Sequence, residues 1–140
     1  EIIGEGSLKY LVDKYKQNIY HTSFLQPEDL VKKLKESHAL ILPSIFEPWG
    51  VILQEAAACG LPIIASNEVG SATKFLINNF NGYRFASSKK DKKNLKKVLE
   101  KLINLPVENL ESFSKGSLSL ANKIETSSAV ANLLSLFSLD

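Results

Sequence analysis

The sequence predicts an α/β fold built on a parallel β-sheet, and the middle of the chain carries most of that prediction. Two short apolar runs, Leu40–Leu42 and Ile63–Ala65, have the length and the flanking turn residues of buried strands. Between them, Val51–Cys59 is rich in helix formers and ends at Gly60, a typical helix stop. Strand, helix and strand in this order form a βαβ unit, whose two strands run parallel.

The rest of the chain continues this alternation. The runs Ile2–Ile3 and Ile19–His21 are predicted to be further strands of one parallel sheet, and Tyr83–Phe85 is predicted to be a short strand after an Asn-Gly turn. Further helices are expected at residues 7–16, 27–37 and 87–104, from residue 71 onward, and as two helices within residues 106–140. The pattern therefore predicts a doubly wound sheet with helices between the strands.

Length and composition narrow the class of protein. The 140 residues are enough for one domain, and 44% hydrophobic content supports a core. A net charge of +2 gives no indication of a nucleic-acid partner. A single cysteine, Cys59, forms no disulfide within the chain and fits a reducing cytoplasm. Because the chain lacks methionine and opens at a strand-like run, we expect a fragment whose first strand is truncated.

Two acidic residues have unusual positions in the central stretch. Glu47 lies in the loop after a predicted strand, and Glu55 lies within a helix that is otherwise apolar nearly all round. A buried carboxylate needs a partner, because burying it alone is costly. Gly50 allows close approach of the backbone at the helix start, where free N–H groups favour an anion such as phosphate. Ligands of open α/β sheets bind at the carboxyl ends of strands, which is where this loop is expected.

The segment from Glu47 to Glu55 resembles the E-x7-E motif of retaining, nucleotide-sugar-dependent glycosyltransferases of the GT-B fold (group 1, family 4 type). The segments 42–44 before the motif, and 55–62 and 64–66 at and after its end, fit the same family. The resemblance implies a Rossmann-like doubly wound parallel sheet that is one half of a GT-B fold. Residues 1–140 would then be the C-terminal donor-binding domain, with the N-terminal acceptor domain absent.

The resemblance also implies roles for individual residues. Glu47 is expected to be the catalytic residue that contacts hydroxyls of the donor sugar, and Glu55 is expected to accept hydrogen bonds from the ribose. The backbone N–H groups of Gly50 and Val51 are expected to meet the phosphate. The remaining residues expected to contact the donor are Gly4, Gly6, Ser44 and Asn67.

The implied reaction is transfer of a hexosyl group, with retention, from a nucleoside-diphosphate sugar to a cell-surface glycan or a lipid. The missing domain would hold the acceptor, so the fragment is expected to be inactive alone. No Asp-x-Asp pair is present, and neither a metal ion nor a cofactor is expected. We expect a cytoplasmic protein with no nucleic-acid partner, and peripheral membrane contact stays open for the full-length protein.

Alternatives remain at several of these residues. Glu55 could form a structural pair with a Lys or Arg, Glu47 could be a solvated loop acid, and the turn at 4–6 could be a plain strand-to-helix turn. Asn67 could lie in a surface turn with Ser71 capping the next helix. For Phe24, core packing is favoured over stacking on a nucleotide base.

Two other classes of function are also open. A sugar-nucleotide epimerase or a phosphorylase would share the fold, and a non-catalytic binding module would use both acids only structurally.

Overall fold

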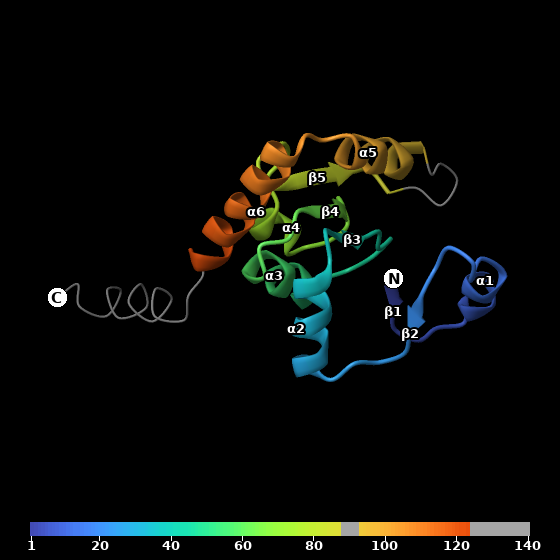
Figure 1. The fold of residues 1–140 in the computed structure, drawn as a ribbon. Helices are drawn as coiled ribbons and strands as arrows, with labels where there is room; N and C mark the ends of the chain where they lie inside the picture. The colour runs from blue at the N-terminus through green and yellow to red at the C-terminus, as the bar shows by residue number, and fades with distance from the viewer. Residues whose placement is uncertain (88–92, 124–140) are drawn as a thin grey trace. The chain divides into compact units, whose positions relative to one another are not determined.

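The computed structural model describes residues 1–87 and 93–123 (Figure 1). Its contacts divide the chain into two compact units, the first comprising Glu1–Lys33 and the second beginning at Leu34. Helix α2 (Pro27–Glu36) crosses this boundary. The last helix predicted within residues 106–140 lies outside the described residues. No described helix is both long and apolar enough to cross a membrane.

The first unit contains a two-stranded parallel sheet. Strand β1 (Ile2–Ile3) pairs with β2 (His21–Thr22), with Ile2 opposite His21. The predicted strand at residues 19–21 is therefore displaced toward the C-terminus, because the short β1 offers pairing partners only to these two residues. Helix α1 (Lys9–Lys14) is shorter than the predicted helix at 7–16 and has no side-chain cap.

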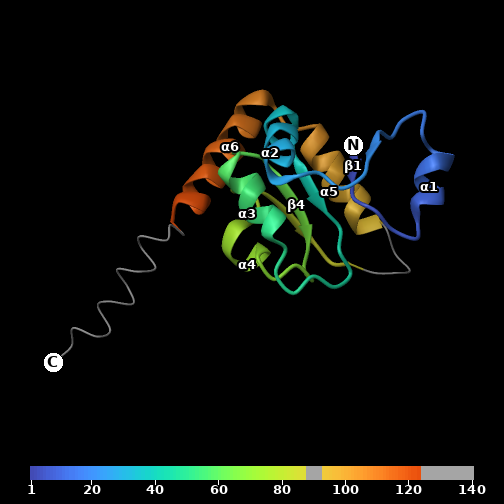
Figure 2. The same ribbon diagram turned by 90° about the horizontal axis from the view of Figure 1, so that it is seen from below.

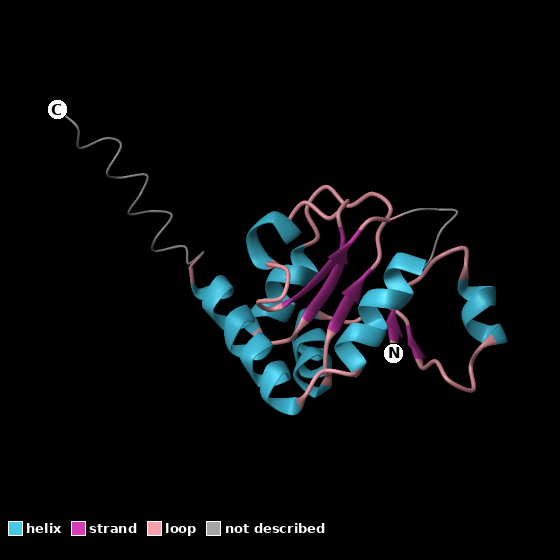
Figure 3. Cartoon of the chain, turned by 90° about the horizontal axis from the view of Figure 1, so that it is seen from above, coloured by secondary structure: helices cyan, strands magenta, loops and turns pink. Residues whose placement is uncertain are grey.

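The second unit contains a three-stranded parallel sheet in the order β3-β4-β5 (Figure 3). These strands are β3 (Leu40–Leu42), β4 (Ile63–Ser66) and β5 (Gly82–Phe85). Leu40 lies opposite Ile63, and Ile63 lies opposite Gly82. All described strand pairs are parallel, which confirms the predicted α/β class, but the strands form two sheets where one was expected.

Helices cover both faces of the three-stranded sheet (Figure 2). Helices α3 (Val51–Ala58) and α4 (Ala72–Phe75) lie on one face, and α5 (Lys93–Ile103) lies on the other. The buried residues of the first face are Leu53, Ala57, Ile63, Ala65, Val69, Ala72, Phe75 and Leu76. Those of the second face are Ile64, Tyr83, Phe85, Leu102 and Phe113. This is the doubly wound arrangement that the sequence predicts.

Helix α6 (Val107–Asn122) is joined to the sheet layer by a buried polar network. The Asn81 side chain accepts a hydrogen bond from the Ile77 N–H and donates to the Phe75 carbonyl, both at 2.8 Å. It also donates to the Ser117 hydroxyl at 3.1 Å, and Ser117 donates to the Leu61 carbonyl at 2.6 Å. Sequence reasoning identified the turn at Asn81 but not this network, because Ser117 and Leu61 come from segments far from Asn81 or from each other in the chain.

Candidate functional site

The candidate site lies in the second unit, where β3 and β4 end. Strand β3 ends at Leu42 and β4 ends at Ser66, and both strands point the same way. The loops 43–50 and 67–71 therefore leave the sheet at the same edge, which is where open α/β sheets bind ligands. An isolated parallel bridge between Glu47 and Val69 shows that the two loops lie side by side.

Backbone hydrogen bonds join the two loops. The Glu47 N–H donates to the Glu68 carbonyl at 3.2 Å, and the Gly70 N–H donates to the Glu47 carbonyl at 3.0 Å. One step further along, the Ser71 N–H donates to the Trp49 carbonyl at 2.8 Å. The loop that carries Glu47 is therefore held along its length by the loop after β4.

Two glycines permit the close approach of these loops. Gly50 precedes α3 with φ of +83°, and a Cβ placed on it would lie 3.1 Å from Cγ of Glu47. A Cβ on Gly70 would lie only 2.0 Å from the carbonyl oxygen of Pro48. Backbone therefore meets backbone at Gly70, which explains why a residue without a side chain occupies this position.

Helix α3 presents Glu55 beside its open face. Its buried residues are Leu53, Ala56 and Ala57, whereas Val51, one turn before Glu55, is 56% exposed. An apolar composition nearly all round predicts a helix buried on most faces, and this prediction is wrong, because one side of the helix is exposed. Glu55 itself is half-buried, as is Glu47.

Neither carboxylate has a polar partner in the part of the chain that the structure describes. Across residues 1–87 and 93–123, the carboxylates of Glu47 and Glu55 have no ion pair and accept no hydrogen bond. The alternative that Glu55 pairs with a Lys or Arg thus finds no partner among these residues. Half-buried acids without a protein partner retain their capacity to accept hydrogen bonds from a ligand.

The start of α3 lies between these two acids in the sequence. Gly50 is its N-cap and, having no side chain, leaves the first N–H groups of this eight-residue helix without a side-chain acceptor. The first N–H groups of α3 thus lie at the positive end of the helix dipole with no side chain capping them. The acid in the loop and the acid in the helix can each accept hydrogen bonds from hydroxyl groups of a ligand. The helix N-terminus between them in the sequence can bind an anionic group of the same ligand.

Ser44 and Asn67, predicted to contact the donor, lie in the same two loops. The Ser44 carbonyl accepts a hydrogen bond from the Ser66 hydroxyl at 2.5 Å. Asn67 is exposed, and its N–H donates to the Phe85 carbonyl at 2.9 Å. The structure therefore places Ser44, Glu47, Gly50, Val51, Glu55 and Asn67 on the elements at this edge of the sheet. Their contacts with a donor stay a prediction.

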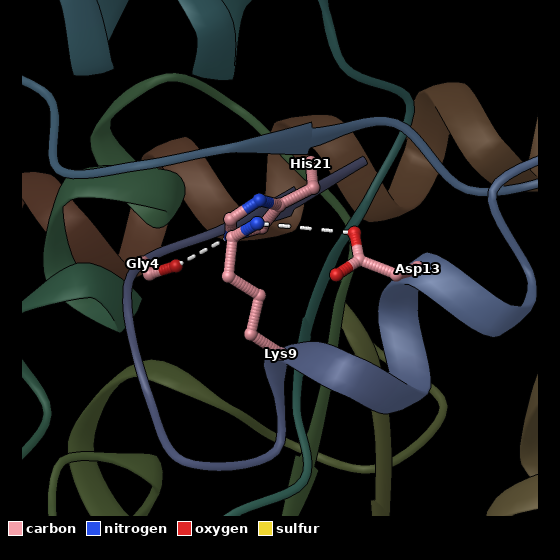
Figure 4. Close-up of polar contacts among 4 residues, drawn as sticks. All are labelled: Gly4, Lys9, Asp13 and His21. Carbon is pink, nitrogen blue, oxygen red and sulfur yellow. Dashed lines mark hydrogen bonds and ion pairs between the residues drawn. The ribbon is translucent and has the colours of Figure 1, made fainter.

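Gly4 and Gly6 belong to the first unit, where they line a hollow of about 220 Å³ with mostly apolar walls. Gly4 has φ of +125°, and its carbonyl lies 2.8 Å from Nε2 of His21 (Figure 4). Lys9 and Asp13 form an ion pair along α1 in the same view. The predicted donor contact of the two glycines stays a prediction.

Two further expectations can be compared with the structure. Phe24 is 74% exposed, so the preferred interpretation of this ring as a core residue is wrong. Ser71 does occupy the N-cap of α4, but its hydroxyl makes no capping bond and instead donates to the Gly50 carbonyl at 2.9 Å. Within the described ranges, no group of three or more His, Cys, Asp and Glu residues could hold a metal ion.

Comparisons with known proteins bear on the family and the fold of the chain. The chain is 31% identical over 87 residues to an uncharacterized glycosyltransferase of Methanocaldococcus jannaschii and 34% identical over 87 residues to a glycogen synthase of Mycobacterium tuberculosis. Each alignment covers 58% of this chain, but only 22% and 21% of the respective relative. The chain thus spans a small part of the curated relatives that it matches.

A solved structure shows the same fold. The pneumococcal O-GlcNAc transferase GtfA, in complex with UDP and GlcNAc, superposes with a TM-score of 0.78 over 96% of this chain and 28% of that one, at 22% identity. This likeness confirms the predicted fold class, a Rossmann-like α/β sheet that corresponds to one half of a GT-B fold. In addition, residues 1–118 match the family described as glycosyl transferases group 1. Because this match covers most of the sequence, the chain belongs to the group 1 glycosyltransferase family.

Proposed function

We propose that this chain is the C-terminal, donor-binding domain of a retaining glycosyltransferase that uses a nucleoside-diphosphate sugar. One observation carries the proposal: Glu47 and Glu55 stand before and after the uncapped start of α3, and neither has a partner among the described residues. A nucleotide-sugar needs acceptors for sugar and ribose hydroxyls and donors for phosphate oxygens, and this segment supplies both.

Each part of the segment has a separate task in this proposal. Glu55 accepts hydrogen bonds from the ribose hydroxyls, and Glu47 contacts hydroxyls of the transferred sugar as the catalytic residue. The N–H groups at Gly50 and Val51 bind the phosphate. As the glycosidic bond breaks with retention, negative charge develops on the leaving diphosphate, and fixed N–H dipoles stabilise that charge without reorganising.

The proposed acceptor is a glycan or a lipid held by an N-terminal domain. The small share of each relative that this chain spans is consistent with a larger enzyme. A cleft between two domains orients the acceptor and excludes water from the reacting atoms. A single domain does neither. The domain by itself is therefore expected to bind a donor without transferring its hexosyl group, in a cytoplasmic enzyme that makes peripheral contact with a membrane.

Calorimetry of the chain with UDP, GDP and ADP tests the donor-binding role. Exchanging Glu55 for Gln turns a charge-assisted hydrogen bond, worth about 1.5–3 kcal/mol, into a neutral one worth about 0.5–1.5 kcal/mol, so the affinity for the preferred nucleotide should fall by roughly 5- to 15-fold. Glu111→Gln makes the same chemical change at an exposed position of α6 and should leave the affinity unchanged. Equal affinity of Glu55→Gln and wild type would remove Glu55 from the site, and binding of none of the three nucleotides would contradict the proposed function.

A further inference from the structure

Two serines at the end of β4 and the start of α4 are completely buried. Ser66 and Ser71 are each 0% exposed. The Ser66 hydroxyl donates to the Ser44 carbonyl at 2.5 Å and accepts from the Glu68 N–H at 3.3 Å. The backbone carbonyl of Glu68 in turn accepts a hydrogen bond from the N–H of Glu47. Ser66 is therefore connected to both the beginning and the middle of the loop that carries Glu47.

Ser71 holds the other end of the same loop. Its hydroxyl donates to the Gly50 carbonyl at 2.9 Å, and its N–H donates to the Trp49 carbonyl at 2.8 Å. The Gly50 carbonyl also accepts the first hydrogen bond of α3, from the Leu53 N–H at 3.0 Å. A displacement of Ser71 would therefore move the residue that sets the direction of the first N–H groups of α3.

The direction of these hydrogen bonds distinguishes them from ordinary local ones. A serine at a helix N-cap usually accepts a hydrogen bond from its own helix, an interaction worth about 1 kcal/mol. The Ser71 hydroxyl forgoes that bond at α4 and reaches 21 residues back to Gly50. The Ser66 hydroxyl likewise reaches back 22 residues. Both side chains thus fasten the loop after β3 instead of their own elements.

We propose that Ser66 and Ser71, here called the serine clamp, are positioning residues for the donor site. The clamp fixes Glu47 through Ser44 and Glu68, and it fixes the start of α3 through Gly50. Neither serine touches the donor; both are 0% exposed and act on it through the loop that they hold. The functional half of this inference rests on the proposed function, whereas the structural half, that the clamp holds the loop, does not.

The chain offers a matched control at Ser117. This serine is also 0% exposed, and its hydroxyl also donates to a backbone carbonyl, that of Leu61, at 2.6 Å. It lies in α6 and fastens the segment before β4, away from the loop of Glu47. Ser117→Ala therefore removes the same chemical group at the same burial, so it reproduces the general loss of stability without loosening the site.

Amide hydrogen exchange tests whether the clamp holds the loop, without any ligand. The reporter is the Gly70 N–H, which donates to the Glu47 carbonyl. In Ser66→Ala and Ser71→Ala its exchange should accelerate by tenfold or more relative to the core amide of Ile64, because the loops open locally. In Ser117→Ala the ratio of the two rates should stay within twofold of wild type. A wild-type ratio in both clamp variants, or an equal change in the control, would overturn the proposal.

Titration with UDP tests the functional half. Ser66→Ala and Ser71→Ala should each weaken UDP binding about fivefold, and Ser117→Ala should leave it unchanged. Wild-type affinity in both clamp variants would show that they are structural only and overturn their positioning role. If wild type bound no UDP, the proposed function would fail for this nucleotide, while the exchange ratio would still decide whether the serines clamp the loop. The two failures are thus distinguishable.

Discussion

Replacing Gly70 with Ala tests the packing of the two loops at the site most directly. The added Cβ would lie 2.0 Å from the Pro48 carbonyl oxygen, whereas ordinary contact begins at 3.4 Å. The added Cβ would meet backbone atoms, so the clash cannot be relieved by moving a side chain. The loops must separate by about 1.4 Å to relieve this contact, and a separation of that size breaks hydrogen bonds that are now 2.8–3.2 Å long.

The expected loss of stability in Gly70→Ala follows from the hydrogen bonds that the separation breaks. Three backbone hydrogen bonds join the loops, through the N–H groups of Glu47, Gly70 and Ser71. At about 1 kcal/mol each, their loss lowers the free energy of unfolding by about 3 kcal/mol. With a urea m-value of about 1–3 kcal/mol/M, the midpoint of urea unfolding should fall by roughly 1–3 M. Glu47 and the start of α3 would move as well, so UDP binding should weaken in the same variant.

Urea titration followed by circular dichroism provides the assay, with Gly6→Ala as its control. A Cβ on Gly6 meets no heavy atom within 4 Å, so the same chemical change there should alter the free energy of unfolding by less than about 0.5 kcal/mol. A Gly70→Ala variant with the wild-type urea midpoint would show that the two loops do not pack in the way described, and the argument for the site would fail with it.

Three further predictions concern the side chain of Asn81, the carboxyl group of Glu1 and the need of the proposed site for a metal. Asn81→Ala removes the three hydrogen bonds of a fully buried side chain and should lower the free energy of unfolding by about 3 kcal/mol, whereas Asn104→Ala, which loses one exposed bond, should cost less than about 0.5 kcal/mol in the same urea titration. The hydrogen bond from Thr22, followed by the contact with Lys33, holds the pKa of the Glu1 carboxyl below its ordinary value of 4.5. Its stabilising contribution is therefore present above pH 4.5 and is lost as the pH falls through the lowered pKa, and an NMR titration should show that pKa rising in Thr22→Val. Because no metal is proposed in the site, EDTA should change the calorimetric affinity for UDP by less than twofold, and a larger loss would reveal a metal requirement.

The sequence predicts the regular elements of the second unit closely. The strand at Leu40–Leu42 is as predicted, and the helix predicted to end at Cys59 ends one residue earlier, with Gly60 in the left-handed conformation after it. Apolar periodicity and the Gly stop determine these elements locally. The strand at His21–Thr22 is displaced because its limits depend on pairing with β1, which no local pattern encodes.

At the site, the sequence identifies residue types but not their pairing. Glu47, Gly50 and Glu55 stand out because an acid in an apolar stretch and a glycine before a helix are unusual in themselves. Ser66 does not stand out, and Ser71 is interpreted as a helix cap, since a serine before a helix usually is one. Their actual partners, Ser44 and Gly50, are about twenty residues away, and only the parallel register of β3 and β4 brings them together.

The bonding of Glu47 explains how the backbone of a loop residue can be held in place, as the proposed catalytic role requires. Its N–H and its carbonyl both bond to the loop after β4, as they would in a parallel strand. Glu47 therefore continues the pairing of β3 and β4 beyond their ends, although the chain between β3 and Glu47 bends at Ile45 and Phe46. A side chain on a paired residue has a defined direction, while one on a free loop must lose conformational entropy when a ligand binds. The proposed catalytic acid thus combines the accessibility of a loop with the order of a strand, and the residues that bond to it, Glu68 and Gly70, belong to the neighbouring loop.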